Sequence, residues 1–373
     1  MAFPSYQIVI ISPYTGEVLR IFDGTSFFDL RFDRALNDVG ALAITLPIED
    51  SFSTLFTKDT FIEIRRTSPI TGDLITEETY LTRLTQRFRE NNDERFVVGG
   101  VSLNNLIARR VIDPADDPLA AGGFSTKAGT ADEVMRSFAR EQMADLASAV
   151  RQFPNLTVST TPGTGLPVGK RARYDNLLEV FQDLALQGET DFIITRYSSN
   201  NLRLSIRPIG TDRTKTSNYP FGEFTQFDPD RGNLTTPSLL TDSKKEQNFC
   251  YALGQGQGDT RIVAKVPGDN LAESPYNRIE FTADIRQSDR SDPLYLLTGA
   301  RSALTENQIR QEFTFEIIQD ASGTIYRKDF DLGDKITCRW RDVSVNLRVT
   351  GIEINLSADE GETISTKLEP YIV

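Results

Sequence analysis

Apolar and polar residues alternate with a period of two over most of residues 329–356, near the end of the chain. From Val343 the apolar set has odd numbers as far as Gly351 and even numbers after it. Side chains on a strand point alternately to opposite faces, so the pattern predicts paired, half-buried strands with a turn at Arg341-Asp342. A glycine that shifts the phase indicates a β-bulge. We therefore predict part of a closed or strongly curved antiparallel sheet.

The first hundred residues show the same alternation in shorter runs. Residues 27–47 predict two strands, because a turn at 37–40 separates two alternating runs and Pro47 ends the second. Further strands are expected near residues 61–65, 79–88 and 95–101. Short strands with regular polar turns indicate a small barrel or sandwich.

A helical period follows these strands. Thr130 and Glu133 form a capping-box sequence, which predicts a helix directly after Thr130. A second helix is expected from about Asp175 to Gly188, followed by a hairpin. Residues 102–210 are therefore predicted to form an α+β domain.

The rest of the chain is strand-rich again, with alternating runs on both sides of one expected helix near 291–311. The predicted fold class is thus a β-rich α+β protein with three domains. The expected boundaries are 1–101 for a β domain, 102–210 for the α+β domain, and 211–373 for a second β domain with the helical insertion. A repeated β architecture would need no visible sequence repeat.

Composition matters chiefly through what it excludes. The 373 residues carry a net charge of −12, from 41 basic and 53 acidic residues, which argues against a protein that coats nucleic acid. Histidine is absent, which removes Ser-His-Asp catalysis, Cys-His catalysis and His-ligated metals. Cys250 and Cys338 are too few for a four-ligand zinc site. No apolar run approaches the about 20 residues of a membrane-spanning helix, and the N-terminus lacks signal-peptide features.

Three motifs could carry chemistry, and each has a simpler interpretation. Residues 254–259 are glycine-rich but lack the Lys-Ser/Thr ending of a phosphate loop, so a turn between strands is favoured. Residues 228–233 depart from the spacing of a calcium loop. Asp113, Asp116 and Asp117 could in principle run glycoside hydrolysis, but Pro-flanked Asp residues are typical of turns. We therefore expect no catalytic, cofactor-binding or metal-binding residues.

The chain also carries a series of segments in a fixed order: RFDRALNDVGALAITLP, FVVGGVSLNNLIARRVIDP, DNLLEVFQDLALQGETDFIIT, YALGQGQGDTRIVAKV with YNRIEFTADIRQ, and DFDLGDKITCRW with RVTGIEINLSADEGETISTKLEP. In this order they resemble the tail-hub family of long-tailed bacteriophages, the baseplate-hub or tail-tip proteins of the short siphophage type. Each segment is only moderately specific, and the shared order across nearly the whole chain carries the resemblance.

The resemblance implies a homotrimer at the distal end of the phage tail tube. The first and third domains would each be a tail-tube-like β-barrel, and three copies would form a pseudo-sixfold ring that adapts a sixfold tube to a threefold tip. The implied partners are a distal tail protein or tail-tube hexamer, the tape-measure protein, and tail fibre or tip proteins. DNA would pass through the lumen without specific binding. The protein would reside in the virion after assembly in the host bacterial cytoplasm.

The ring contacts are expected to include the 28–34 and 41–46 hairpin and the 334–356 sheet. The candidate interface residues are Phe28, Leu30, Phe32, Leu42, Ile44, Val345, Leu347 and Val349. Many relatives continue into a hydrolase, fibre or host-binding module, whereas this chain ends at Val373, so such roles are expected to fall to a separate protein. Three alternatives stay open: the hub of a contractile or phage-derived injection particle, a carboxylate-based cell-wall hydrolase, and a carbohydrate-binding module.

Overall fold

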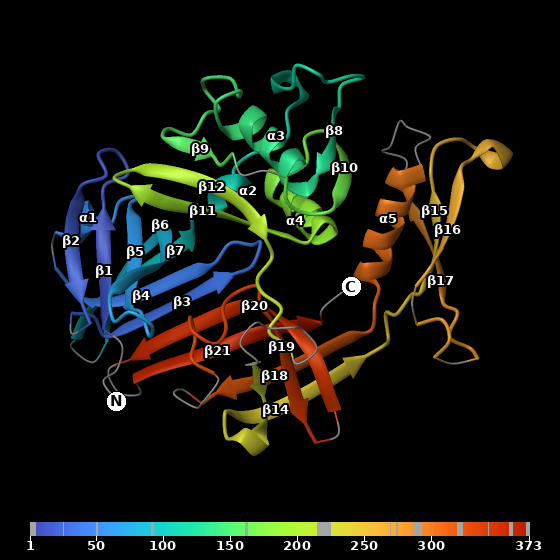
Figure 1. Ribbon diagram of the computed structural model, residues 1–373. Helices are drawn as coiled ribbons and strands as arrows, with labels where there is room; N and C mark the ends of the chain where they lie inside the picture. Colours follow the sequence, from blue (N-terminus) through green and yellow to red (C-terminus); the bar gives the residue numbers. More distant parts are fainter. Residues whose placement is uncertain are drawn as a thin grey trace.

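A large curled sheet dominates the computed structural model of the protein (Figure 1). The structure describes residues 5–24, 26–49, 51–90, 93–160, 163–214, 225–268, 270–273, 275–285, 293–318, 324–341, 343–357 and 361–370. Within these residues the sheet has 13 strands, and three smaller sheets of two or three strands accompany it. Asp342 of the expected turn and positions 291 and 292 of the expected helical insertion lie outside the described residues.

The first strand region comprises β1 to β7. Its elements are β1 Tyr6–Ile11, β2 Val18–Asp23, β3 Asp29–Ala35, β4 Ala41–Pro47, the short helix α1 Phe52–Leu55, β5 Phe61–Thr67, β6 Leu74–Glu90 and β7 Asp93–Ser102. The strands pair in the order β3-β4-β7-β6-β5-β1-β2. The predicted hairpin at 27–47 is present as β3 and β4, and alternate side chains of both strands are buried.

The middle region combines three helices with two small sheets. Its elements are α2 Asn105–Ala108, β8 Ser125–Thr130, α3 Ala131–Met143, β9 Leu156–Val158, β10 Pro167–Ala172, α4 Leu177–Gly188, β11 Thr190–Ser198 and β12 Asn201–Pro208, with a 3₁₀ turn at Pro114–Asp116. The predicted capping box is confirmed at Thr130 and Glu133, at the start of α3. Glu189 ends α4 in the left-handed conformation, directly after the predicted stop at Gly188.

The last strand region returns to the large sheet. Its elements are β13 Gln226–Phe227, a 3₁₀ turn at Pro229–Arg231, β14 Leu234–Asp242, β18 Arg310–Ile317, β19 Lys335–Trp340, β20 Val343–Ser357 and β21 Gly361–Pro370. These strands pair in the order β14-β18-β21-β20, with β19 on β20 and β13 on β19. The phase shift at Gly351 is confirmed as a bulge, because the register of β20 against β21 shifts between Val349 and Gly351.

A side unit projects from the last strand region, between β14 and β18 (Figure 1). It comprises β15 Phe249–Leu253, a 3₁₀ turn at Gly258–Thr260, β16 Val263–Pro267, β17 Glu280–Asp284 and α5 Pro293–Glu306. The three strands form their own sheet in the order β16-β15-β17, and Cys250 and Ala300 meet in a small core between this sheet and α5. The segment between β14 and β18 is therefore larger than the helix that the sequence predicts near 291–311.

One hydrophobic core runs through the first and last strand regions. Phe32 of β3 and Ile354 of β20 are both fully buried in it, although 322 positions separate them along the chain. A second core lies between α3, α4 and the sheet of β11 and β12, and it reaches Val9 on the opposite face of β1. The middle region is thus fixed to the back of the first strand region by apolar burial.

The shared core generates the first prediction. Phe32→Asp places a carboxylate without a partner among apolar side chains, which costs several kcal/mol. We expect no soluble folded protein from this variant, judged by circular dichroism and size-exclusion chromatography. Phe28→Asp, four residues earlier, is the matched control, because 40% of Phe28 is exposed. A folded Phe32→Asp protein would contradict the burial assignment.

Candidate functional site

β3 and β20 join the two strand regions in one antiparallel ladder. The pairs run from Asp29 opposite Ser357 to Ala35 opposite Gly351. β3 also pairs with β4, and β20 also pairs with β21, so the ladder makes one sheet of both regions. We call this ladder the joint. Its inward side chains belong to the common core, so backbone pairing and apolar burial reinforce each other there.

The two strand regions repeat the same spatial strand order, with one difference in direction: β13 runs parallel to β19, whereas β1 runs antiparallel to β5. In the first, β1, β3, β4, β5, β6 and β7 pair in the spatial order β3-β4-β7-β6-β5-β1. In the last, β13, β14, β18, β19, β20 and β21 pair in the order β14-β18-β21-β20-β19-β13. Taken in chain order, each strand of one set corresponds to one of the other. β2 has no counterpart, and the side unit occupies the place of the turn between β3 and β4.

The long strands β6 and β20 correspond in detail. Each carries a bulge against its hairpin partner, between Thr82 and Leu84 in β6 and between Val349 and Gly351 in β20. Before the bulge, β6 pairs with β5 and β20 pairs with β19. After its bulge, β20 leaves β19 and pairs with β3 of the other region. A bulge twists a strand and redirects it, which allows one long strand to serve two neighbours.

Two strand edges lack the partner that this correspondence predicts. Among the described strands, residues 84–88 of β6 pair with β7 alone, and residues 238–242 of β14 pair with β18 alone. We call these two segments the open edges. Leu84 on β6 is 54% exposed, and Leu240 on β14 is 49% exposed. Pro237 lies in a register shift of β14, where a residue that donates no backbone hydrogen bond can be accommodated.

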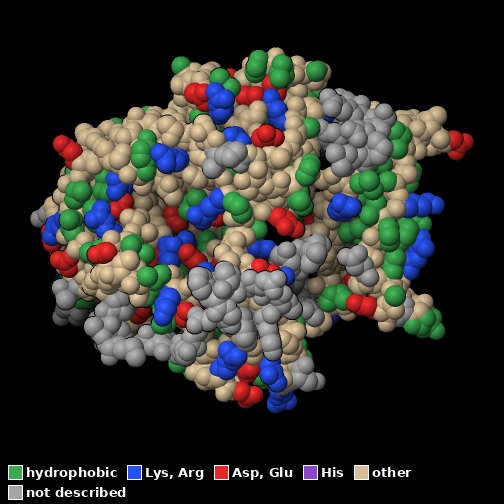
Figure 2. All heavy atoms as spheres, in the orientation of Figure 1, with side chains coloured by type: hydrophobic (Ala, Val, Ile, Leu, Met, Phe, Trp, Pro, Cys, Tyr) green, Lys and Arg blue, Asp and Glu red, His purple; other side chains and the backbone are tan. Residues whose placement is uncertain are grey.

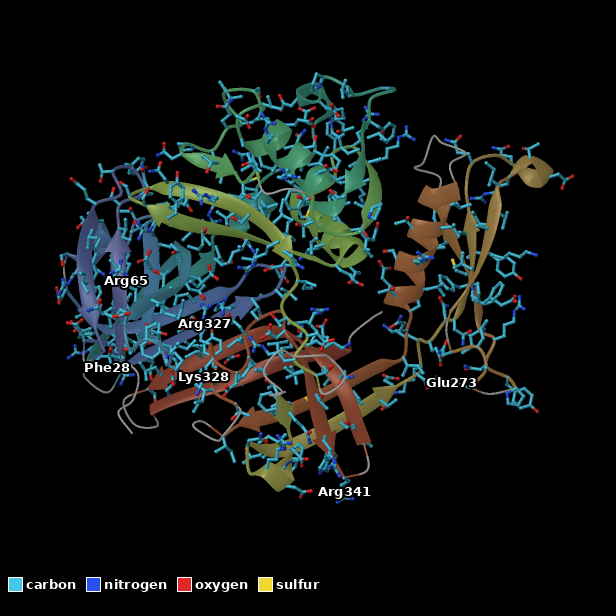
Figure 3. All side chains as sticks on the ribbon, in the orientation of Figure 1. Phe28, Arg65, Glu273, Arg327, Lys328 and Arg341 are labelled. Atoms are coloured by element: carbon cyan, nitrogen blue, oxygen red, sulfur yellow. The ribbon has the colours of Figure 1, made fainter. Side chains whose placement is uncertain are left out.

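The candidate interface residues lie mostly inside the chain's own core. The buried ones are Leu30, Phe32, Leu42, Ile44, Leu347 and Val349. Phe28 is exposed at the end of the first strand region, as Figure 3 shows, and Val345 is partly buried. Alternation identified the buried face of these strands, but the atoms on that face belong to the same chain. Their role in a ring stays a prediction, and only their backbone edges and outward faces are available for it.

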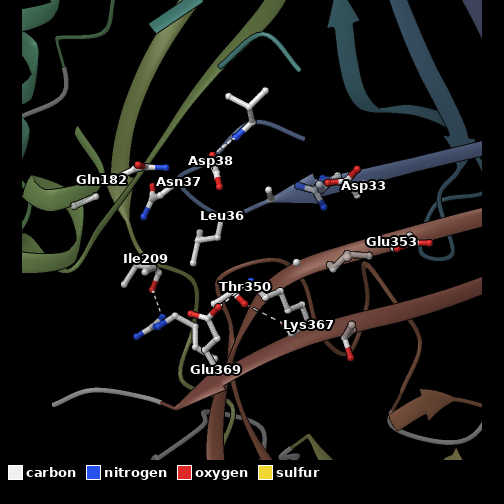
Figure 4. A pocket seen from close by; sticks show the side chains of 18 of the residues that line it. Asp33, Leu36, Asn37, Asp38, Gln182, Ile209, Thr350, Glu353, Lys367 and Glu369 are labelled. Atoms are coloured by element: carbon white, nitrogen blue, oxygen red, sulfur yellow. Dashed lines mark hydrogen bonds and ion pairs between the residues drawn. The ribbon is translucent and has the colours of Figure 1, made fainter. Parts of the chain in front are cut away.

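A hollow of about 730 Å³ lies on the outer side of the joint, beside α4 (Figure 4). Several of its charged side chains have partners: Glu353 pairs with Arg31 at 2.9 Å, and Lys367 pairs with Glu369 at 3.0 Å. Arg348 donates to the carbonyl oxygen of Gly333 at 2.7 Å. The lining therefore offers no converging set of polar groups for a cofactor.

The three motifs that could have carried chemistry form turns and ion pairs in the structure. Asp113 caps the 3₁₀ turn by accepting from the amide of Ala115, and Asp116 pairs with Arg151 at 2.5 Å. Asp117 is buried beside Lys127, at 3.0 Å. The glycine-rich segment 254–259 connects β15 to β16, and the 228–233 segment is the 3₁₀ turn after β13. In the part of the chain that the structure describes, no cluster of three or more acidic or cysteine side chains is placed to hold a metal.

A buried ion network crosses the inner side of the joint, and the sequence patterns did not predict it. Arg34 of β3 donates to the hydroxyl of Tyr326 and to Asp331, each at 2.7 Å. Glu77 of β6 accepts from the same hydroxyl and from Arg327, each at 2.8 Å. Figure 3 shows Arg327 where the N-terminal and C-terminal strands meet. Although burial alone would raise the pKa of Asp331, the guanidinium groups of Arg34 and Arg327 hold it below its usual value.

The network continues to Glu362, near the start of β21. Arg66 of β5 makes a two-pronged ion pair with Glu362, at 2.7 and 3.0 Å, and also donates to the hydroxyl of Tyr6. Arg66 and Glu362 are both almost fully buried, so breaking the pair would leave a buried charge alone. Arg66 also lies 5.5 Å from the ring of Tyr326, which links the two halves of the network. Charged groups from both strand regions are thus interlocked.

The face in Figure 2 carries acidic and basic side chains interspersed with one another. None of the helices in the described ranges is long and apolar enough to cross a lipid bilayer.

A family match and three similar structures concern tail proteins. The family model of the siphovirus ReqiPepy6 Gp37-like proteins matches residues 14–367, whereas no curated protein matches the chain in sequence. A tail protein from Neisseria meningitidis is similar in structure, with a TM-score of 0.58 and 10% identity over 98% of this chain and 96% of that one. The 43 kDa tail protein of prophage MuSo2 from Shewanella oneidensis also has a TM-score of 0.58, with 11% identity over 98% of both chains.

A third similar structure is the prophage tail protein gp18 from Listeria monocytogenes, with a TM-score of 0.56 and 8% identity over 97% of this chain and 94% of that one. At such identities the structures show a shared fold, and the family match is what assigns the chain. The resemblance to phage tail proteins that the sequence predicts is confirmed. The chain belongs to the siphovirus ReqiPepy6 Gp37-like family of phage tail proteins.

Proposed function

We propose that this protein is a non-enzymatic tail hub that forms a homotrimeric ring at the distal end of the tail tube. The repeated strand order is the observation that carries the proposal. One chain contains two units with the same strand order, joined where β20 passes its bulge and pairs with β3. Three copies would present six such units, which suits a sixfold tube on one side and a threefold tip on the other.

The open edges are the equivalents of the joint. The segment of β6 after its bulge corresponds to the segment of β20 in the joint, and β14 corresponds to β3. We propose that residues 84–88 of one copy pair with residues 238–242 of the next. When the strand registers of the two units are matched, Gln86 aligns with Leu240 of the neighbour and Arg87 with its Leu239. Repetition of this contact would close a ring of alternating units.

Edge chemistry supports this pairing. An exposed strand edge offers unpaired backbone groups, and soluble proteins usually protect such edges with charge, proline or a cover. On the two open edges the apolar side chains of Leu84 and Leu240 are about half exposed. In the proposed register they lie diagonally across the two strands, so pairing would cover both. The ring would then bind a distal tail protein or the tube, the tape-measure protein, and fibre or tip proteins, and its acidic net charge would let DNA pass without sticking.

A cross-linking experiment tests the ring. Gln86→Cys combined with Leu240→Cys places two thiols directly opposite each other between copies, at a separation that a disulfide can bridge. We expect mild oxidation to yield covalent species of two and three chains on a denaturing gel. The native Cys250 and Cys338 are buried, so they leave the background low. Gln86→Cys combined with Leu119→Cys is the control, since Leu119 lies in the middle region and is 79% exposed.

A second test of the proposed contact places a charged side chain on the open edge of β14. Leu240→Asp should fold normally, because the side chain is already half exposed, but it should lose ring assembly in analytical ultracentrifugation. Leu119→Asp should assemble like the original protein. Rings that form equally well with Leu240→Asp, together with no cross-linking in the double-cysteine variant, would contradict the proposed contact.

A wall-cleavage assay tests the non-enzymatic role. Asp116 is mostly buried against Arg151, and removing such a charge-assisted hydrogen bond costs about 1.5–3 kcal/mol. Asp116→Asn should therefore lower the unfolding free energy, while cleavage of purified cell wall stays at background in both proteins. The matched control is Asp145→Asn, whose exposed pair with Arg140 should be worth less than about 1 kcal/mol. Wall cleavage by the original protein that Asp116→Asn abolishes would support a hydrolase instead.

A further inference from the structure

The charges on the inner side of the joint do not balance. Three guanidinium groups enter the network, from Arg34, Arg66 and Arg327. Four carboxyl groups face them, from Glu77, Glu78, Asp331 and Glu362. Glu78 is the odd one, because the others each form a direct ion pair with an arginine, whereas Glu78 receives only the amide of Thr79 at 3.3 Å.

A bulge explains why two adjacent glutamates meet the same network. The register of β5 against β6 shifts between Ile64 and Arg65, which lie opposite Glu78 and Thr76. Glu77 is the extra residue of β6 at this point. A regular strand would turn neighbouring side chains to opposite faces, but a bulge breaks this alternation. Glu77 is therefore buried against Arg327, while Glu78 lies partly buried near Arg34.

We infer that the joint is a proton-controlled latch, in which Glu78 binds the proton that balances the network and its ionisation weakens the contact between the two strand regions. The inference goes beyond the proposed ring and does not depend on it. It rests on the excess carboxyl group, on the burial of the network and on its position across the joint. A single side chain, Glu78, takes up or releases the proton. Its ionisation state changes the stability of the pairing between β3 and β20.

The electrostatics agree with this geometry. Burial raises the pKa of Glu78 to about 7, and the nearby charge of Glu77 adds to this effect, although Arg34 opposes it. An unfolded glutamate titrates near 4.5. The folded protein therefore holds one more proton than the unfolded chain between these values, and stability falls as the pH rises through this window. Below the window the full stabilisation is present, and above about 7 it is lost.

Other titratable groups face the network or lie near it, and burial raises the pKa of several of them. Burial raises the pKa of Tyr6, Tyr80 and Tyr326, so these phenols stay neutral. Burial also raises the pKa of Asp191, from β11, although its ion pair with Arg207 at 2.7 Å opposes this effect. On the outer side of β3, burial raises the pKa of Asp33, whose carboxylate accepts from the amide of Ala41 at 2.8 Å. Glu353 faces the same outer side and pairs with Arg31.

Urea unfolding at several pH values tests the latch. For the original protein, the folding equilibrium constant should fall by up to tenfold for each pH unit between about 5 and 7, since one proton is involved. Glu78→Gln cannot ionise and should remove this slope. Glu353→Gln, on the outer side of the same joint, should keep it and so corrects for the general effect of the net negative charge. Equal slopes in the original protein and in Glu78→Gln would overturn the inference.

A second measurement needs no variant to fold. Carbon-13 labelling of the glutamate carboxyl groups, followed by NMR titration of the original protein, should show a carboxyl that titrates near pH 7. If every glutamate titrates below about pH 5.5, the latch is wrong, because an ordinary glutamate pKa lies near 4.3. Both measurements work on the single chain, so failure of the latch and failure of the ring are distinguishable.

Discussion

The pairing of β3 with β20 is the contact on which the rest of the structure depends. It turns two strand regions, separated by the whole middle region, into one sheet with one core. Two forces act at the same place: the ladder satisfies the backbone groups of both strands, and Phe32 and Ile354 bury their side chains behind it. The ion network then crosses the joint on its inner side. Loss of this pairing would expose two long edges and a large apolar surface together.

The repeated strand order distinguishes the structural elements that occur twice in the chain from those that occur once. The set of six strands occurs twice, whereas β2, the middle region and the side unit occur once. In the proposed ring the repeated strands would appear six times and the single features three times. A ring of this kind presents sixfold and threefold features at once, and that is the physical basis for adapting a tube to a tip.

Sequence patterns predicted local structure, but they did not predict which distant strands pair with each other. The phase shift at Gly351 predicted the bulge, and Thr130 with Glu133 predicted the start of α3, because both signals lie within a few residues. Alternation in β3 identified its buried face, but period-two patterning is the same whether a strand pairs with its own chain or with another. The joint therefore could not be read from the sequence. Neither could the network, since the adjacent Glu77 and Glu78 look like a solvated stretch until a bulge places them against arginines.

Imaging of the purified protein tests the central claim most directly, namely that one chain supplies two equivalent units of a closed ring. Class averages from negative-stain electron microscopy at high protein concentration should show threefold rings with six lobes in one tier. Purified protein that assembles into rings with another symmetry, or with one lobe for each chain, would contradict the account.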